Sequence, residues 1–248
     1  MISDVDVAAA AFPVLPYPAT LVPGRLIRRY KRFLADVRLD DGREVVAHVA
    51  NSGSMMGLST PGMRVWLCPK TSGSLPWSWA VVEVEIDGRP TLVGVDTAAP
   101  NKLGLAAVGA GLLPAFAGYD SVRREVRYGV NSRIDLLLAS AGRPKAFVEI
   151  KNVHLWRRGA LAEFPDAVTA RGAKHLVELS NEVAAGGRAA MLFIVQGPAA
   201  GFAIARDLDP VYGRAFDLAR ACGVEAHCWS ATVTLEGVQL DREVPIVD

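Results

Sequence analysis

Two short segments decide the fold of this chain: Ser132-Arg133-Ile134-Asp135-Leu136-Leu137-Leu138 and Ala146-Phe147-Val148-Glu149-Ile150-Lys151-Asn152-Val153. Within each segment apolar residues alternate with polar ones around the acidic positions, which is the period of a β-strand. The intervening Ala139–Pro144 segment contains a glycine and a proline and predicts a turn. We therefore expect two neighbouring strands joined as a hairpin.

The polar positions of these two strands would bring two carboxylates and a lysine together. Asp135 and Glu149 are expected to meet on one face, with Lys151 two residues further along it. Three apolar residues should point the other way, into a core: Ile134, Leu136 and Leu138. Two carboxylates are suitable oxygen ligands for Mg²⁺ or Mn²⁺, and such an ion can polarise a phosphate and acidify a bound water.

The pattern therefore predicts that Asp135, Glu149 and Lys151 are catalytic residues for phosphodiester cleavage. The two carboxylates would bind the metal ion, and the lysine would position water or stabilise charge on the phosphate. A salt bridge between two strands at the surface is the other interpretation of the same spacing.

Composition limits the class of protein. The chain has 248 residues, enough for one large domain or two small ones, and is 51% hydrophobic and 21% charged, as in soluble globular proteins. A net charge of +1 means that any basic surface is local. Three cysteines, at positions 68, 222 and 228, fit no zinc or disulfide spacing and indicate free thiols in the cytoplasm.

The chain divides into three parts. Residues 1–20 show neither a signal peptide nor a membrane span and are expected to be a loosely ordered lead-in, with no membrane partner. Residues 21–95 should form a small OB-like barrel, because turn signals separate five short strand-like runs. The runs are Arg25–Tyr30, Phe33–Leu39, Glu44–Ala50, Arg64–Pro69 and Trp79–Ile86.

Residues 96–248 have a different pattern, in which helices and strands are mixed. Helices are expected at Asn101–Leu113, Asp166–Ala185 (with Asp166 as N-cap) and Tyr212–Cys222. Strands are expected at Val122–Tyr128, Arg133–Leu138, Ala146–Asn152, Ala189–Gln196 and Val224–Trp229. This order predicts an α/β domain with a mixed sheet and helices on both faces.

A basic segment of the barrel is the first candidate nucleic-acid surface. It contains five cations in eight residues and no acid: Arg25, Arg28, Arg29, Lys31 and Arg32. Tyr30 and Phe33 lie among them, and barrels of this type bind phosphates with cations and stack bases on aromatic rings. The alternative is an edge strand kept soluble by its charges. The adjacent loop, Asn51–Gly57, either offers N–H groups to a phosphate or is a tight structural turn.

The predicted helix after the carboxylates is the second candidate. Its core stripe should consist of Val168, Gly172, Leu176, Leu179 and Val183. Arg171 and His175 lie one turn apart beside this stripe and are candidates for phosphate contacts, as is Lys174, which is also placed to pair with Glu178. A half-solvated helix edge is the alternative.

Several longer stretches carry a resemblance to a known family. They include Arg32-Phe33-Leu34-Ala35-Asp36-Val37, Ala47-His48-Val49-Ala50-Asn51-Ser52-Gly53-Ser54-Met55, Ser132-Arg133-Ile134-Asp135, Val148-Glu149-Ile150-Lys151-Asn152-Val153 and Phe164-Pro165-Asp166-Ala167-Val168-Thr169-Ala170-Arg171-Gly172-Ala173-Lys174-His175-Leu176. From Leu21 to Trp229 the chain resembles the sugar fermentation stimulation protein A family. The resemblance implies an OB-like domain, a restriction-endonuclease-like domain of the PD-(D/E)xK type, and binding to DNA.

The chain departs from the PD-(D/E)xK pattern at the first helix, since Asn101–Leu113 contains no acid. Glu125 on the preceding strand is the candidate replacement as a metal ligand, or it pairs only with Arg123 or Arg127. Arg133, next to the site, is a further candidate for nucleic-acid contact. His154 stands where a threonine is expected, and it either touches the site or is a solvated strand end.

Two functions follow as expectations. The first is a Mg²⁺- or Mn²⁺-dependent nuclease acting on DNA without sequence specificity. The second is a non-catalytic DNA-binding regulator of sugar-utilisation genes that keeps the nuclease fold. A homodimer is compatible with either.

Overall fold

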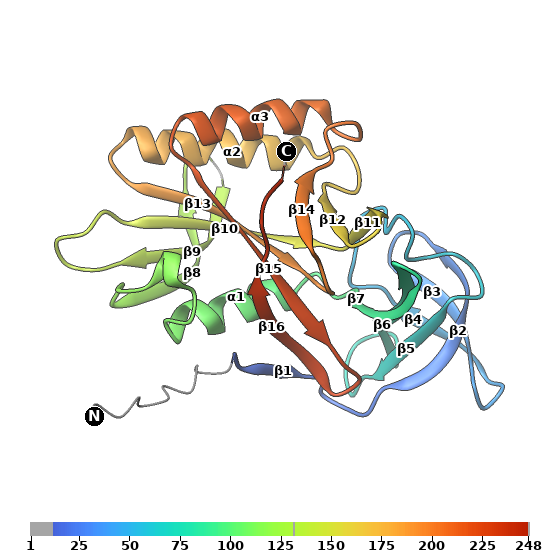
Figure 1. Cartoon of the computed structure of the whole chain (residues 1–248). Coiled ribbons are helices and arrows are strands. Elements are labelled where there is room, and N and C mark those ends of the chain that lie inside the picture. The colour runs from blue at the N-terminus through green and yellow to red at the C-terminus, as the bar shows by residue number, and fades with distance from the viewer. Residues whose placement is uncertain (1–11, 131, 248) are drawn as a thin grey trace, which may run out of the picture.

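A closed barrel forms the N-terminal part of the computed structural model, which describes residues 12–130 and 132–247 (Figure 1). Its strands are β2 (Val22–Tyr30), β3 (Leu34–Leu39), β4 (Glu44–His48), β5 (Arg64–Pro69) and β6 (Trp77–Ile86). They run in the order β4-β3-β2-β5-β6, and parallel pairing of β4 with β6 closes the barrel. The predicted OB-like barrel is confirmed, and β7 (Arg89–Gly94) extends it as an unpredicted strand on β6.

A seven-stranded mixed sheet forms the second part. Its order is β1 (Val14–Pro16), β16 (Gly237–Glu243), β15 (Glu225–Val233), β13 (Arg188–Val195), β10 (Ala146–Val153), β9 (Ser132–Ala139) and β8 (Ser121–Tyr128). The central strands β10, β13 and β15 are parallel, and the outer pairs are antiparallel. Residues 1–11 of the expected lead-in lie outside the described residues. Within its described part, Val14–Pro16 is not loose but forms β1, because β16, itself unpredicted, pairs with this segment in an antiparallel manner.

A small three-stranded sheet lies beside the large one and was not predicted. It consists of β11 (Leu155–Arg158), β12 (Leu161–Phe164) and β14 (Gly201–Ile204). These strands have four residues each, too short for their alternation to stand out in the sequence.

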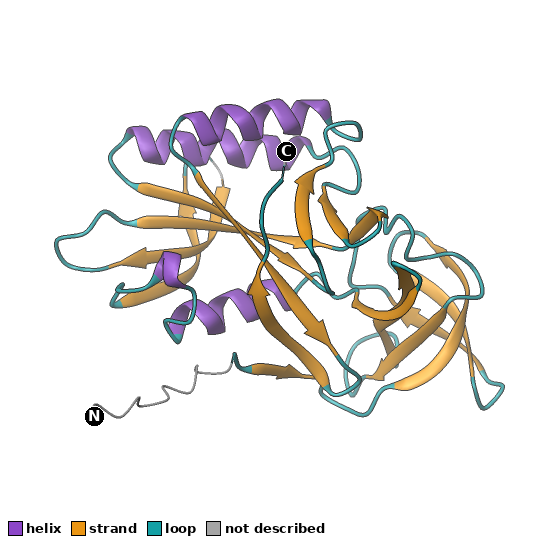
Figure 2. Cartoon of the chain, viewed as in Figure 1, coloured by secondary structure: helices purple, strands orange, loops and turns teal. Residues whose placement is uncertain are grey.

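Helices cover both faces of the large sheet, as expected (Figure 2). Helix α1 (Ala99–Gly109), followed by a short 3₁₀ turn (Pro114–Phe116), packs on one face. Helices α2 (Ala170–Ala184) and α3 (Pro210–Ala221) lie side by side on the other, against a core that includes Phe193.

The start of α2 differs from the prediction. The Thr169 hydroxyl caps the helix by accepting a hydrogen bond from the Gly172 backbone N–H at 3.1 Å, so Asp166 is not the N-cap. Val168 precedes the helix and is 75% exposed, which removes it from the predicted core stripe. Leu176 and Leu179 are fully buried, as predicted.

The predicted alternation on β9 fails at one residue. Leu136 and Leu138 pack on the α1 side of the sheet, but Ile134 packs on the α2 side. The register between β9 and β10 ends at Leu136 and Val148, so the strand changes face at Asp135. Because the regular pairing of β9 with β10 stops here, the Asp135 side chain does not follow the alternation of the rest of β9.

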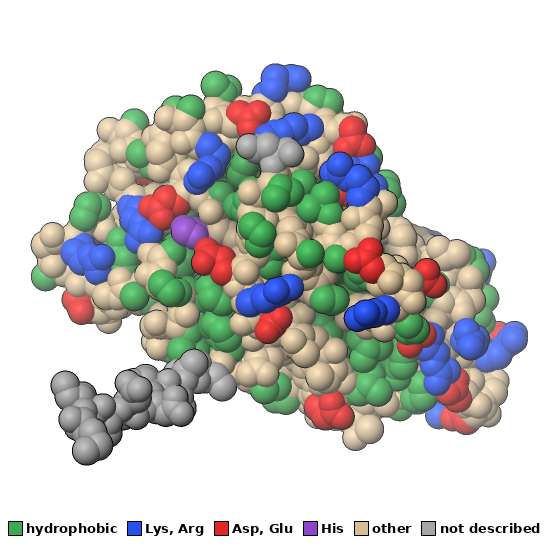
Figure 3. Space-filling model, in the orientation of Figure 1, with side chains coloured by type: hydrophobic (Ala, Val, Ile, Leu, Met, Phe, Trp, Pro, Cys, Tyr) green, Lys and Arg blue, Asp and Glu red, His purple; other side chains and the backbone are tan. Residues whose placement is uncertain are grey.

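The surface carries mixed charge. On the face drawn in Figure 3, basic and acidic side chains are interspersed and form no continuous basic patch. The cysteines are free thiols, as predicted, with Cys68 and Cys228 buried and Cys222 exposed. Among the described residues no helix has the length and apolar character to cross a membrane.

Candidate metal centre

Asp135 lies where β9 and β10 separate. Its Oδ2 accepts a hydrogen bond from the Ile150 backbone N–H at 2.7 Å, and its Oδ1 accepts one from the Asn101 amide at 3.0 Å. The carboxylate therefore replaces a carbonyl of the interrupted ladder, and α1 fixes its orientation. The PD-(D/E)xK pattern often has an acid on the first helix, which the sequence lacks here, and α1 supplies the amide of Asn101 instead.

Glu149 is buried beneath α2, with 3% of its surface exposed. Its Oε1 accepts a hydrogen bond from Lys151 Nζ at 2.6 Å and also contacts His175 Nδ1. Its Oε2 is buried and has no hydrogen-bond partner among the described residues. A buried carboxylate oxygen without a partner is costly unless a cation or water binds it.

The buried charge of Glu149 affects the protonation of Asp135. Burial, followed by the negative charge of Glu149, raises the pKa of Asp135 to about 6. Burial acts in the same direction on Glu149, but the hydrogen bond from His175 and the charge of Lys151 outweigh it and lower the pKa of Glu149. The pair thus contains one firmly ionised carboxylate and one whose ionised form is disfavoured without a cation nearby.

Helix α2 supplies the wall of the site through His175. This side chain is 4% exposed, so it lies inside the site rather than on the solvated helix edge that was the alternative. Arg171 Nε donates to His175 Nε2 at 3.3 Å, which leaves the ring proton on Nδ1, facing Glu149. Arg171 and His175 therefore extend the polar network from Glu149 toward the surface.

Lys174, on the same helix, contacts the turn between β8 and β9. Its Nζ donates to the Val130 carbonyl at 2.9 Å and lies 3.6 Å from Glu178, which confirms the predicted i,i+4 pair. Its contact with nucleic acid stays a prediction.

Glu125 is exposed on β8, and its register neighbours place it opposite Asp135. Its backbone φ is +52°, so the edge strand β8 is irregular at Glu125, opposite the irregularity of β9 at Asp135. Among the described residues it forms no ion pair with Arg123 or Arg127, and no cluster of three Asp, Glu, His or Cys side chains is arranged around a metal position. Its role as a ligand stays a prediction.

The cations of the barrel's basic segment are largely engaged within the barrel. Arg28 pairs with Asp36 at 2.7 Å, and Arg25 donates to the Gly62 carbonyl at 3.0 Å. The Arg29 guanidinium donates to the carbonyls of Asn51 and Gly53, both at 2.9 Å, and Arg32 donates to that of Ser52 at 3.0 Å. Lys31 is exposed. Arg29 and Arg32 thus hold the loop that follows β4, a function that sequence reasoning missed.

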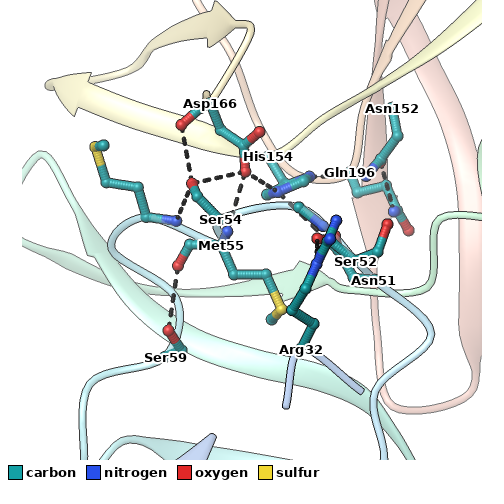
Figure 4. Close-up of polar contacts among 12 residues, drawn as sticks. Arg32, Asn51, Ser52, Ser54, Met55, Ser59, Asn152, His154, Asp166 and Gln196 are labelled. Carbon is teal, nitrogen blue, oxygen red and sulfur yellow. Dashed lines mark hydrogen bonds and ion pairs between the residues drawn. The ribbon is translucent and has the colours of Figure 1, made fainter. Parts of the chain in front are cut away.

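This loop connects the barrel to the second domain (Figure 4). The Asp166 carboxylate accepts hydrogen bonds from the Met55 backbone N–H and the Ser54 hydroxyl, both at 3.0 Å. His154 is 7% exposed and lies 3.3 Å from the same carboxylate. His154 is therefore neither a solvated strand end nor a contact of Asp135 or Glu149. The backbone N–H of Met55 in this loop therefore binds the carboxylate of Asp166.

Family models match almost the whole length of both domains. Residues 27–95 match the model described as the SfsA N-terminal OB domain. Residues 98–237 match the model described as the sugar fermentation stimulation protein RE domain.

Curated relatives have similar sequences over nearly their full length. A sugar fermentation stimulation protein homolog of Azorhizobium caulinodans is 55% identical over 234 residues, covering 93% of this chain and 99% of the relative. One of Paramagnetospirillum magneticum is 56% identical over 227 residues, covering 90% and 94%. Among solved structures, SfsA of Pyrococcus furiosus in complex with Ca²⁺ superposes with a TM-score of 0.84 at 28% identity, covering 97% of this chain and 100% of that one.

Proposed function

This chain belongs to the sugar fermentation stimulation protein family, and we propose that it is a DNA-binding protein with a divalent-metal-dependent nuclease site at Asp135, Glu149 and Lys151. The observation that carries the proposal is the Oε2 atom of Glu149, which is buried without a partner among the described residues. The charge of Glu149 contributes to the raised pKa of Asp135, as expected for two carboxylates that share one site.

The donor set fits a hard cation. Asp135 and Glu149 would hold it, since carboxylate oxygens are the preferred ligands of Mg²⁺, Mn²⁺ and Ca²⁺. The Pyrococcus furiosus relative was solved with Ca²⁺, which supports a divalent site in this fold. A bound ion would supply Lewis-acid polarisation of a phosphate and a more acidic water.

The surrounding side chains give the site its remaining properties. Asn101 and the Ile150 N–H fix the orientation of the Asp135 carboxylate. Lys151, whose side chain is 15% exposed, brings a positive charge to Glu149 from a position that solvent reaches. That charge can orient an attacking water or stabilise an anionic phosphate. Arg171 keeps the His175 proton directed at Glu149, which keeps this carboxylate ionised and ready to bind a cation.

A cleavage assay tests the proposal. Labelled single- and double-stranded DNA and RNA are incubated with the protein in Mg²⁺, Mn²⁺ or EDTA. We expect metal-dependent cleavage that Glu149→Gln lowers by about a hundredfold to a thousandfold, because loss of one well-placed electrostatic group costs that order in rate. Glu44→Gln, an exposed carboxylate of the barrel, is the matched control and should retain full activity.

Two results of this assay would contradict the proposed nuclease site. Salt-sensitive binding of DNA with no cleavage in any metal would contradict the nuclease and favour a DNA-binding regulator built on the same fold. Cleavage that Glu149→Gln leaves unchanged would place the chemistry elsewhere in the chain or in a contaminant.

A further inference from the structure

The β8–β9 hairpin carries four exposed arginines but only one exposed acid among its described residues, Glu125; its second acid, Asp135, is part of the candidate metal centre. The arginines are Arg123, Arg124, Arg127 and Arg133. Among the residues that the structure describes, none of the four forms an ion pair. The barrel differs, because Arg28, Arg38, Arg43 and Arg64 are each paired with a carboxylate. Within the described part of the chain, the hairpin therefore carries four arginines without a carboxylate partner on two adjacent strands.

The register brings two of these charges face to face. Arg127 lies directly opposite Arg133 across the two strands. Like charges in this position are destabilising, so the pair costs free energy unless an anion lies between or above the two guanidinium groups. Together with Tyr128, Gly129 and Ser132, they line a surface cavity of about 460 Å³, and guanidinium groups bind phosphate oxygens in a bidentate manner.

The hairpin is continuous with the metal centre and is held against it. Arg133 lies two residues before Asp135 on β9. At the turn, Val130 donates its backbone N–H to Glu178 at 3.2 Å and accepts from Lys174 at 2.9 Å. Helix α2, which supplies His175 to the site, thus also anchors the end of the hairpin.

We propose that the β8–β9 hairpin is a phosphate-binding arm, in which Arg127 and Arg133 bind a backbone phosphate of the nucleic acid next to the one at Asp135 and Glu149. The proposal rests on the proposed function for the identity of the polyanion. Arg123 and Arg124 add further positive charge along the same edge strand. This places the main phosphate contacts on the nuclease-like domain rather than on the basic segment of the barrel.

The test measures binding of a fluorescent oligodeoxynucleotide, single-stranded and duplex, in EDTA over a range of salt concentrations. The double variant Arg127→Gln with Arg133→Gln should bind at least about tenfold more weakly, a loss of about 1.4 kcal/mol, because two charged hydrogen bonds to phosphate are removed. The slope of log affinity against log salt should fall by about 2, which is about 1 for each lost phosphate contact. Both side chains are exposed, so the variant should fold normally.

The matched control is Arg38→Gln with Arg43→Gln, which removes two exposed arginines from the barrel and should leave affinity within about twofold of wild type. The proposal is overturned if the hairpin variant binds as tightly as wild type at every salt concentration, or if it merely self-associates, as expected when an edge strand loses protective charges. It is also overturned if wild type binds no oligonucleotide in EDTA. Mn²⁺ titration of the hairpin variant, expected to match wild type, tests the metal centre separately.

Discussion

Replacing Asp135 with Asn is expected to lower the affinity for Mn²⁺ at least about a hundredfold, because changes merely next to a metal ligand already cost 10- to 100-fold. The carboxylate loses its charge but keeps its volume, and the amide of Asn101 and the N–H of Ile150 still surround the side chain. Isothermal titration calorimetry or the electron paramagnetic resonance of Mn²⁺ measures the change.

The same variant should not lose stability in the absence of metal. Because the pKa of Asp135 is raised to about 6 in the fold, its contribution to stability is fully present below about pH 4 and is lost as pH rises through 6. Asn at this position avoids that loss, so its melting temperature at pH 7 in EDTA should equal or exceed that of wild type. Asp41→Asn, an exposed barrel carboxylate, is the control and should leave Mn²⁺ affinity unchanged. A strongly destabilised Asp135→Asn protein, or one that binds Mn²⁺ normally, would contradict the assignment.

Replacing Asp166 with Asn is expected to lower the free energy of unfolding at pH 7 by about 2 kcal/mol. Burial alone would raise the pKa of this carboxyl, but the hydrogen bond with His154 and those from Ser54 and Met55 outweigh it and lower the pKa to about 2. The carboxylate side chain is 18% exposed, so solvent screens it only in part. Urea denaturation and thermal melting measure the loss, which corresponds to a fall in Tm of about 4–8 °C for a chain of this size.

The sign of the pH dependence separates this contribution from ordinary packing. A lowered pKa gives stability that is present above about pH 4 and lost as pH falls toward 2. The difference between wild type and Asp166→Asn should therefore narrow over this range. Glu44→Gln, at an exposed ion pair, should change stability by less than about 1 kcal/mol. A gap between wild type and Asp166→Asn that stays constant from pH 7 to 2.5 would show that the charge does not carry the effect.

Alternation and turn chemistry predicted most of the fold. The five barrel strands, the central strands of the large sheet and the three helices were all expected, because each has enough residues for its period to be visible. The short strands β11, β12 and β14 were missed, since their pairing depends on partners distant in the sequence. Strand β16 was missed for a similar reason, as it pairs at one edge with residues 14–16.

The site itself was predictable only in outline. Spacing alone placed Asp135, Glu149 and Lys151 together, but the change of face at Asp135 and the amide of Asn101 depend on how α1 packs. Asp166 was taken for a helix cap because its residue type is common there, whereas Thr169 has that role. Asp166 instead binds a loop 111 residues away, a contact that no local pattern reports.

The connection between the domains also fixes their spacing. Besides Asp166, the backbone N–H of Gly94 donates to the Gln196 carbonyl at 3.0 Å, and the Gln196 amide donates to Asp96 and Asn152 at 2.9 and 2.7 Å. The short segment between barrel and sheet is thus bonded to the end of β13 and is not a free hinge. Domains that are already bonded to each other lose little conformational entropy when a ligand binds across them. If the proposed nucleic-acid binding extends over both domains, the nucleic acid has to fit the distance between them. Binding would then bend the nucleic acid and not the protein.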